Sequence, residues 1–235
     1  MSTILITGAN KGLGREAARQ LIAAGHTVYV GARDLARGQA TAEELGARFV
    51  QIDVTDDDSV AAAAKTIAAD GGLDVLVNNA GIELRADDGG FLPVAGVTGD
   101  SMRAVFDTNV FGQVRMLHAF LPLLQRSSAP VVVNVSSGLS RTREIANPDS
   151  FMHFYPGVEY PASKAAVNML TVQYAKAFPG IRINAVEPGY TATDLNHNAG
   201  TQTVEQGAEI IVRMAQIGTD GPTGGFFDAN GALAW

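Results

Sequence analysis

Short runs of Val, Ile and Leu alternate along the chain with longer, Ala-rich stretches. The apolar runs are continuous rather than alternating with polar residues, which is typical of strands buried on both faces of a parallel sheet. The Ala-rich stretches predict the connecting helices of βαβ units. The predicted strands cover residues 3–7, 26–32, 48–54, 73–79, 130–137 and 182–188, and the predicted helices cover 12–24, 35–46, 57–69, 101–126 and 160–177.

This order of elements predicts an α/β fold with a Rossmann-like doubly wound parallel sheet flanked by helices. Because no linker, low-complexity run or repeat divides the chain, we expect a single domain over residues 1–235. Three long segments interrupt the alternation, residues 86–100, 138–159 and 191–203. Each follows the carboxyl end of a predicted strand, where open α/β sheets bind ligands. We expect 138–159 and 191–203 to be substrate-side loops.

The composition and charge narrow the class of protein. With 46% hydrophobic and 17% charged residues among 235, the chain can bury a sizeable core. The absence of cysteine excludes disulfides and thiol chemistry and suits a reducing compartment. The net charge of −7 opposes binding to nucleic acid or anionic membranes, and no stretch is long and apolar enough for a membrane span. We therefore expect a cytoplasmic protein that binds neither nucleic acid nor membrane.

The four histidines are scattered along the chain without the spacing of metal ligands. Thiolate ligands are excluded as well, because there is no cysteine. The sequence therefore predicts no metal site.

A glycine-rich turn, TGANKGLG (7–14), joins the first predicted strand to the first helix. Glycines let the backbone approach a pyrophosphate, and free N–H groups at a helix N-terminus face the anion. The Lys-Ser/Thr pair of a nucleotide-triphosphatase loop is missing, because Arg15 and Glu16 follow the turn. A dinucleotide ligand is favoured over a plain structural turn. The residues expected to contact it are Gly8, Asn10, Lys11, Gly12, Leu13 and Gly14.

The residue after the second predicted strand helps to distinguish an NADP(H) site from an NAD(H) site. Arg33 stands where this fold meets the adenosine ribose, and an arginine there can pair with a 2′-phosphate. Lys11 in the glycine turn is a second cation that could converge on that phosphate. NADP(H) is therefore preferred. NAD(H) stays possible because Asp34 is adjacent and because both cations could be solvated surface charges.

The motifs taken together resemble the short-chain dehydrogenases/reductases, in the compact single-domain form similar to carbonyl reductases. They occur in order over nearly the whole chain, which makes the set far more specific than any one motif. The motifs are TGANKGLG (7–14), DV (53–54), NNAG (78–81), Asn109 in DTNVFG, NVSS (134–137), YPASK (160–164) and PGYTAT (188–193).

The resemblance implies roles for further cofactor-binding residues. Asp53 would bind the adenine amino group and Val54 would line its pocket. The family often has valine in place of Thr191, a change that a backbone contact survives. Taken singly, these motifs also fit a helix-capping aspartate, an Asn turn and a Pro-Gly bend. The other residues that the resemblance assigns to the cofactor cleft are Asn79, Ala80, Gly81, Tyr160, Lys164, Pro188, Gly189 and Thr193.

Two tyrosines near the middle of the chain differ in their neighbours one helical turn on. A free tyrosine has a pKa of about 10, too high for an efficient base near neutral pH. Lys164 follows Tyr160 at i+4, on the same helix face, and its charge favours the phenolate. Tyr155 has Glu159 at that spacing, which would raise the pKa of its phenol instead. Tyr160 is the predicted acid/base, and Tyr155 is interpreted as a loop aromatic.

Ser136 and Ser137 end the fifth predicted strand, and strand side chains alternate between faces, so only one points into the cleft. The resemblance selects Ser137, which would hydrogen-bond the substrate carbonyl. A serine nucleophile is disfavoured because no G-x-S-x-G elbow surrounds it. By resemblance, Lys164 would also bind the nicotinamide ribose, and Asn109 would hold a water that links Lys164 to solvent. The predicted catalytic residues are Asn109, Ser137, Tyr160 and Lys164.

Ser137 and Tyr160 lie 23 positions apart, which is longer than the usual spacing in the family. The extra residues predict a wall for a small apolar carbonyl or alcohol substrate. A similar, larger insertion occurs in monomeric carbonyl reductases of the family, so either a monomer or a homo-oligomer is expected. The apolar and aromatic residues of this insertion are Phe151, Met152, Phe154 and Tyr155.

The predicted function is NADPH-dependent reduction of a ketone or aldehyde to an alcohol. One alternative is NAD-dependent oxidation of a hydroxy compound on the same fold. The other is a non-catalytic NADP(H) sensor, which would have no need of a tyrosine beside a lysine.

Overall fold

The computed structural model describes residues 1–86 and 89–235. Eight strands form one sheet in the order β3-β2-β1-β4-β5-β6-β7-β8, and neighbours are parallel except for the antiparallel pair β7 and β8. The predicted doubly wound α/β fold is confirmed. The strands are β1 (Thr3–Thr7), β2 (Thr27–Ala32), β3 (Arg48–Gln51), β4 (Val75–Asn78), β5 (Val131–Val135), β6 (Arg182–Val186), β7 (Phe226–Asp228) and β8 (Gly231–Leu233).

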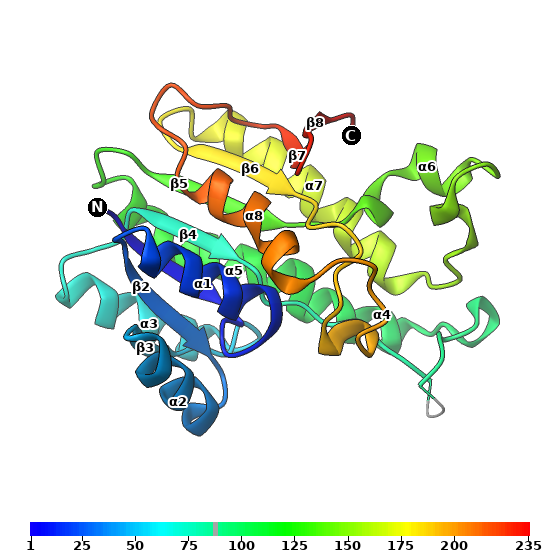
Figure 1. Cartoon of the computed structure of the whole chain (residues 1–235), viewed down its shortest axis with the longest axis horizontal. Coiled ribbons are helices and arrows are strands. Elements are labelled where there is room, and N and C mark those ends of the chain that lie inside the picture. The colour runs from blue at the N-terminus through cyan, green and yellow to red at the C-terminus, as the bar shows by residue number, and fades with distance from the viewer. Residues whose placement is uncertain (87–88) are drawn as a thin grey trace.

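Helices cover both faces of the sheet (Figure 1). Because strand side chains alternate, Ile4 and Ile6 pack under the helices on one face, while Leu5 belongs to the core under the other face. Helices α1 and α8 cover the first face, and α3, α5 and α7 cover the second. The helices are α1 (Gly12–Ala23), α2 (Leu35–Leu45), α3 (Asp57–Ala69), α4 (Gly99–Phe106), α5 (Gly112–Leu124), α6 (Thr142–Ala146), α7 (Glu159–Ala177) and α8 (Val204–Ala215).

Several elements differ from the pattern-based expectation. Helix α8 follows the loop 191–203 and was not predicted, although Thr203 and Gln206 form the capping box that marks its start. The single helix predicted over 101–126 is divided into α4 and α5 by a five-residue π-helix, Asp107–Phe111. The segment 138–159 contains short helices in addition to loop, and residues 87–88 of the predicted loop 86–100 lie outside the described residues.

Buried polar side chains tie together the strand ends that carry the site. The Asn78 side chain donates to Asn134 (2.9 Å), which donates in turn to Thr171 of α7 (2.8 Å). Asn79 donates to the carbonyl of Thr7 at the end of β1 (2.8 Å). These bonds fix β1, β4, β5 and α7 relative to one another, because an unpaired amide in this core would be costly.

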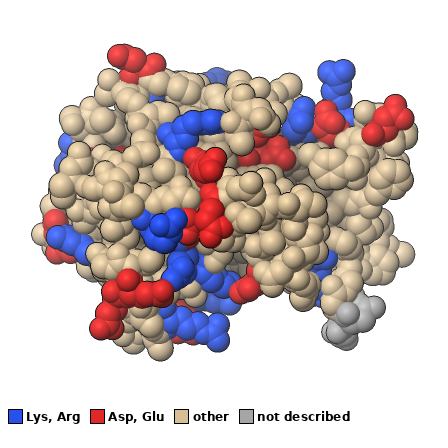
Figure 2. Space-filling view, in the orientation of Figure 1, with Lys and Arg blue, Asp and Glu red and all other residues tan. Residues whose placement is uncertain are grey.

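The carboxyl ends of the parallel strands meet at one edge, on the right in Figure 1, beside α6 and the loop that precedes α8. On the face drawn in Figure 2, acidic and basic side chains lie beside one another across a mostly uncharged surface. Within 1–86 and 89–235, no helix has the length and apolar character that a membrane crossing requires.

Candidate active site

A cavity of about 830 Å³ opens at the carboxyl edge of the sheet. It reaches from the glycine-rich turn, past the ends of β2, β4 and β5, to the loop before α8 and the segment 151–156. Every residue predicted to bind the cofactor lines this cavity. They are Gly8, Asn10, Lys11, Gly12, Leu13, Gly14, Arg33, Asp53, Val54, Asn79, Ala80, Gly81, Tyr160, Lys164, Pro188, Gly189, Thr191 and Thr193.

The glycine turn has the geometry of an anion cradle. Gly8 and Gly12 adopt φ of +65° and +53°, a region that disfavours side chains. A Cβ on Gly14 would lie 2.5 Å from the side-chain nitrogen of Asn79, so only glycine allows α1 to start this close to β4. The side chain of the N-cap residue, Lys11, makes no capping hydrogen bond to α1. Its first N–H groups are therefore available to a phosphate, and the turn fits the pyrophosphate of a dinucleotide.

The two cations expected near a 2′-phosphate have different surroundings. Arg33 is exposed at the end of β2 and lines the cavity. Lys11 pairs with Asp194, which also lines the cavity, with 3.2 Å between nitrogen and oxygen, and both side chains are more than half exposed. Asp34 caps α2 by accepting from the Arg37 N–H at 3.0 Å. The structure therefore places Arg33 in the cavity and directs Lys11 to Asp194, a pairing that the sequence did not predict.

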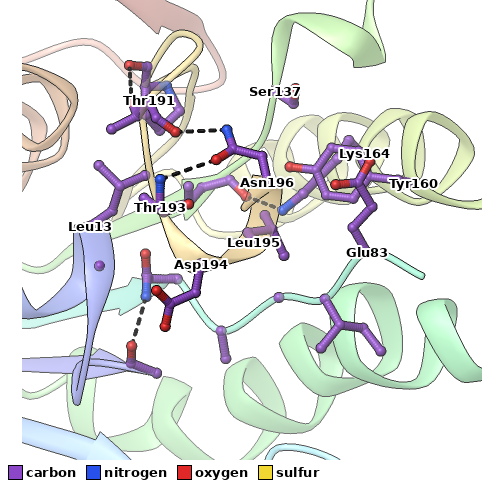
Figure 3. Close-up of a pocket in the computed structure, with 18 of the residues that line it drawn as sticks. Leu13, Glu83, Ser137, Tyr160, Lys164, Thr191, Thr193, Asp194, Leu195 and Asn196 are labelled. Atoms are coloured by element: carbon purple, nitrogen blue, oxygen red, sulfur yellow. Dashed lines mark hydrogen bonds between the residues drawn. The ribbon is translucent and has the colours of Figure 1, made fainter. Parts of the chain in front are cut away.

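Helix α7 places Tyr160 and Lys164 on one face, as the spacing predicts (Figure 3). The Lys164 ammonium lies 5.5 Å from the centre of the Tyr160 ring and donates to the Val135 carbonyl at 2.8 Å. Ser137, at the end of β5, hydrogen-bonds the Tyr160 phenol. Ser136 points away and donates to Asn168 at 2.6 Å in the core. The cavity thus brings a phenol, an ammonium and a hydroxyl together beside the glycine turn.

Burial governs the protonation of both ionisable groups on α7. Lys164 is only 3% exposed, and loss of hydration lowers its pKa to about 8. Burial and the negative charges of Glu83 and Glu187 raise the pKa of Tyr160, against the hydrogen bond from Ser137. Burial of the phenol, which the sequence did not reveal, therefore leaves the pKa of Tyr160 raised even though Lys164 lies nearby, and the expected stabilisation of the phenolate by Lys164 stays a prediction. The site holds a protonated phenol, which is a proton donor.

Asn109 lies in the π-helix behind the cavity and is fully buried. Its side chain accepts from the Ile82 N–H (2.8 Å) and donates to the Ile82 carbonyl (2.9 Å) and to Ser163 (3.0 Å). These bonds pin the turn after β4 against α7. The side chain is fully engaged by protein groups, so the predicted link to a water stays a prediction. A π-helix inside an α-helix is frequent at functional sites.

Two acidic residues and an arginine that the sequence motifs did not single out also line the cavity, Glu83, Glu187 and Arg85. The Tyr155 hydroxyl donates to Glu83, and burial together with this bond raises the pKa of Tyr155. A raised pKa was expected for Tyr155, but its causes are burial and Glu83 rather than Glu159. Glu83 directly follows the NNAGI motif at a strand end, and this position was the available signal.

The insertion 138–159 closes the other end of the cavity. Phe151, Met152, Phe154 and Tyr155 all line it, and Phe151 and Phe154 are largely exposed at its rim. Among residues 1–86 and 89–235, no cluster of three or more His, Cys, Asp or Glu side chains could hold a metal ion.

A glycine turn with positive φ angles, opening a helix in a doubly wound sheet, defines the class of dinucleotide-binding α/β proteins. The sequence profile of the short chain dehydrogenase family matches residues 2–204. The chain belongs to this family, as the motifs predicted, and is an NAD(P)-dependent oxidoreductase acting on CH–OH or C=O groups.

Individual proteins support the same assignment. The chain is 33% identical to the (−)-isopiperitenone reductase of Mentha piperita, over 98% of this chain and 97% of that protein. It is 29% identical to the (+)-neomenthol dehydrogenase of Capsicum annuum, over 95% of this chain and 94% of that one. Among solved structures, the NADPH-bound carbonyl reductase from chicken fatty liver superposes with a TM-score of 0.87 at 26% identity, covering 100% and 99% of the two chains.

Proposed function

We propose that this protein is an NADPH-dependent carbonyl reductase that converts a ketone or aldehyde to a secondary or primary alcohol. The observation that carries this proposal is the meeting of Tyr160, Lys164 and Ser137 in the cavity that the glycine turn lines. A protonated phenol suits reduction, because the alkoxide that forms from the carbonyl needs a proton.

The preference for NADPH rests on the end of β2. Arg33 is exposed and lines the cavity, where it can pair with a 2′-phosphate. Asp34, the residue that could accept from a free 2′-hydroxyl, is occupied as the cap of α2 and pairs with Arg37. The NADPH-bound state of the carbonyl reductase from chicken fatty liver agrees with this preference. Lys11 would contribute only after leaving Asp194.

The chain's own residues account for the steps around the hydride, which the bound nicotinamide supplies. Ser137 donates a hydrogen bond to the substrate carbonyl and holds it beside Tyr160. Tyr160 gives its proton to the alkoxide oxygen, and its oxygen keeps the electron pair as phenolate. The nearby Lys164 ammonium stabilises that phenolate. Asn109 holds the turn after β4 in place behind them.

The substrate is proposed to be a small or medium-sized apolar carbonyl compound, or the corresponding alcohol. The insertion supplies an aromatic and thioether wall through Met152, Phe154 and Tyr155. Relatives that align over nearly their whole length are named for reactions on isopiperitenone and neomenthol, which supports this class of substrate. A cytoplasmic location, with the protein either a monomer or a homo-oligomer, completes the proposal.

The test follows NADPH and NADH consumption with a panel of aliphatic and aromatic ketones. The variant Tyr160→Phe should lose about 10²- to 10⁴-fold in reduction rate while still binding NADPH. Tyr174→Phe is the matched control, because Tyr174 lies on the same helix, stacks on Phe178 and does not line the cavity. Equal rates for Tyr160→Phe and wild type would refute the mechanism. Tight NADPH binding by a wild type inactive on every carbonyl would favour a sensor.

A further inference from the structure

Glu83 presents a buried carboxylate on the wall of the cavity. It lies in the segment after β4, and its side chain is only 7% exposed. The Arg85 guanidinium pairs with one carboxylate oxygen at 2.7 Å, and the Tyr155 hydroxyl donates to the other. Two partners from different segments therefore hold the charge at one place.

Aromatic contacts brace these two partners. The Arg85 guanidinium lies 3.9 Å above the centre of the Phe91 ring, and the Phe91 ring meets Tyr155 edge-on at 4.9 Å. The backbones of Arg85 and Phe91 also form a β-bridge. Glu83, Arg85, Phe91 and Tyr155 thus form a closed ring of contacts, which we call the Glu83 clamp. Because each member contacts two others, these contacts favour the observed position of the carboxylate in the cavity wall.

The clamp faces the proposed proton donor. Figure 3 shows Glu83 beside Tyr160, on the side of the phenol away from the glycine turn. The other groups that act on or contact this phenol are Lys164 on α7, Ser137 after β5, Glu187 after β6 and Tyr155 in the insertion. Glu83 is the stronger of the two negative charges acting on the phenol. A fixed negative charge disfavours formation of a second one nearby, which here is the phenolate.

We propose that Glu83 is a positioning residue that sets the pH range of the reaction, because its clamped carboxylate keeps the Tyr160 phenol in the proton-donating form. This inference rests on the proposed role of Tyr160. The Glu83 carboxylate does not change the equilibrium between ketone and alcohol, which no enzyme can alter. It extends ketone reduction to higher pH. It also shifts alcohol oxidation, which needs the phenolate as base, to higher pH.

The test compares pH profiles of kcat/KM for ketone reduction with NADPH and for oxidation of the product alcohol with NADP⁺. Glu83→Gln should move the rising limb of the oxidation profile to lower pH, so that oxidation near neutral pH becomes about three to ten times faster. The pH above which kcat/KM for ketone reduction falls should also move to a lower value. The double variant Glu83→Gln/Arg85→Met removes both charges, leaves no unpaired guanidinium, and should show the same direction of shift.

Arg85→Met and Tyr155→Phe are the matched controls, because each disturbs the clamp and keeps the carboxylate. Neither should move the oxidation limb to lower pH. An unchanged limb in Glu83→Gln and the double variant, with NADPH binding intact, would overturn the inference. So would a downward shift in all the variants, which would indicate a loosened pocket rather than a lost charge. A wild type inactive on every carbonyl would instead refute the proposed function, and this inference with it.

Discussion

Replacing Lys164 with methionine tests how much stability the protein gives up to keep an ammonium in its cavity. Lys164 is 3% exposed, and burial lowers its pKa from the ordinary value of 10.5 to about 8. Each unit of pKa shift corresponds to about 1.4 kcal/mol, so the charged form destabilises the folded protein by about 3 kcal/mol at neutral pH. Loss of the bond to the Val135 carbonyl costs about 1 kcal/mol in return. Lys164→Met should therefore be about 2 kcal/mol more stable, and inactive.

The pH dependence gives a sharper test than the stability at one pH. Between about pH 8 and 10.5 the unfolded chain holds the Lys164 proton while the folded protein has released it, so wild-type stability rises with pH in this window. From about pH 7 to about pH 9.5 the gain is about 2 kcal/mol. The comparison ends there because tyrosines of the unfolded chain ionise near pH 10. Lys164→Met lacks this gain.

The assay is urea unfolding of the cofactor-free protein at several pH values across that window. Lys65→Met is the control, since Lys65 is exposed on α3 and should keep the wild-type slope. Parallel pH profiles for wild type and Lys164→Met would refute the reasoning, because the buried ammonium would then carry no cost. A Lys164→Met protein less stable than wild type near pH 7 would do so as well.

Three further predictions address the cofactor and the pocket. Arg33→Ala should lower the preference for NADPH over NADH, measured as the ratio of the two kcat/KM values, by about 10- to 100-fold. Arg37→Ala should leave this ratio unchanged, because Arg37 does not line the cavity. Gly14→Ala should lower the thermal unfolding midpoint and weaken dinucleotide binding, because a Cβ would lie 2.8 Å from the Gly8 carbonyl oxygen. Gly99→Ala is the control, because a Cβ there would meet open space. Tyr155→Phe should change relative KM values across a ketone panel more than kcat, and a uniform loss of kcat would contradict its place in the pocket wall.

The fold and the binding edge could be predicted from the sequence because both follow from local patterns. Continuous apolar runs between Ala-rich stretches are enough to predict a parallel sheet with covering helices. Glycines at the start of α1 predict the turn, and the i+4 spacing alone predicts that Tyr160 and Lys164 share a helix face. Even the unpredicted α8 had a local signal, the capping box of Thr203 and Gln206.

Only the tertiary structure decided the electrostatics of the site. The sequence places a helpful charge near Tyr160 but does not reveal burial, which raises the pKa of the phenol instead of lowering it. Glu83 is 77 positions away from Tyr160, and Asp194 is 183 positions away from Lys11. Burial and Coulomb interactions depend on distance in space, and the fold sets that distance independently of separation along the chain. The sequence by itself therefore determined which residues are present at the binding edge, and the fold decided which of them act on one another.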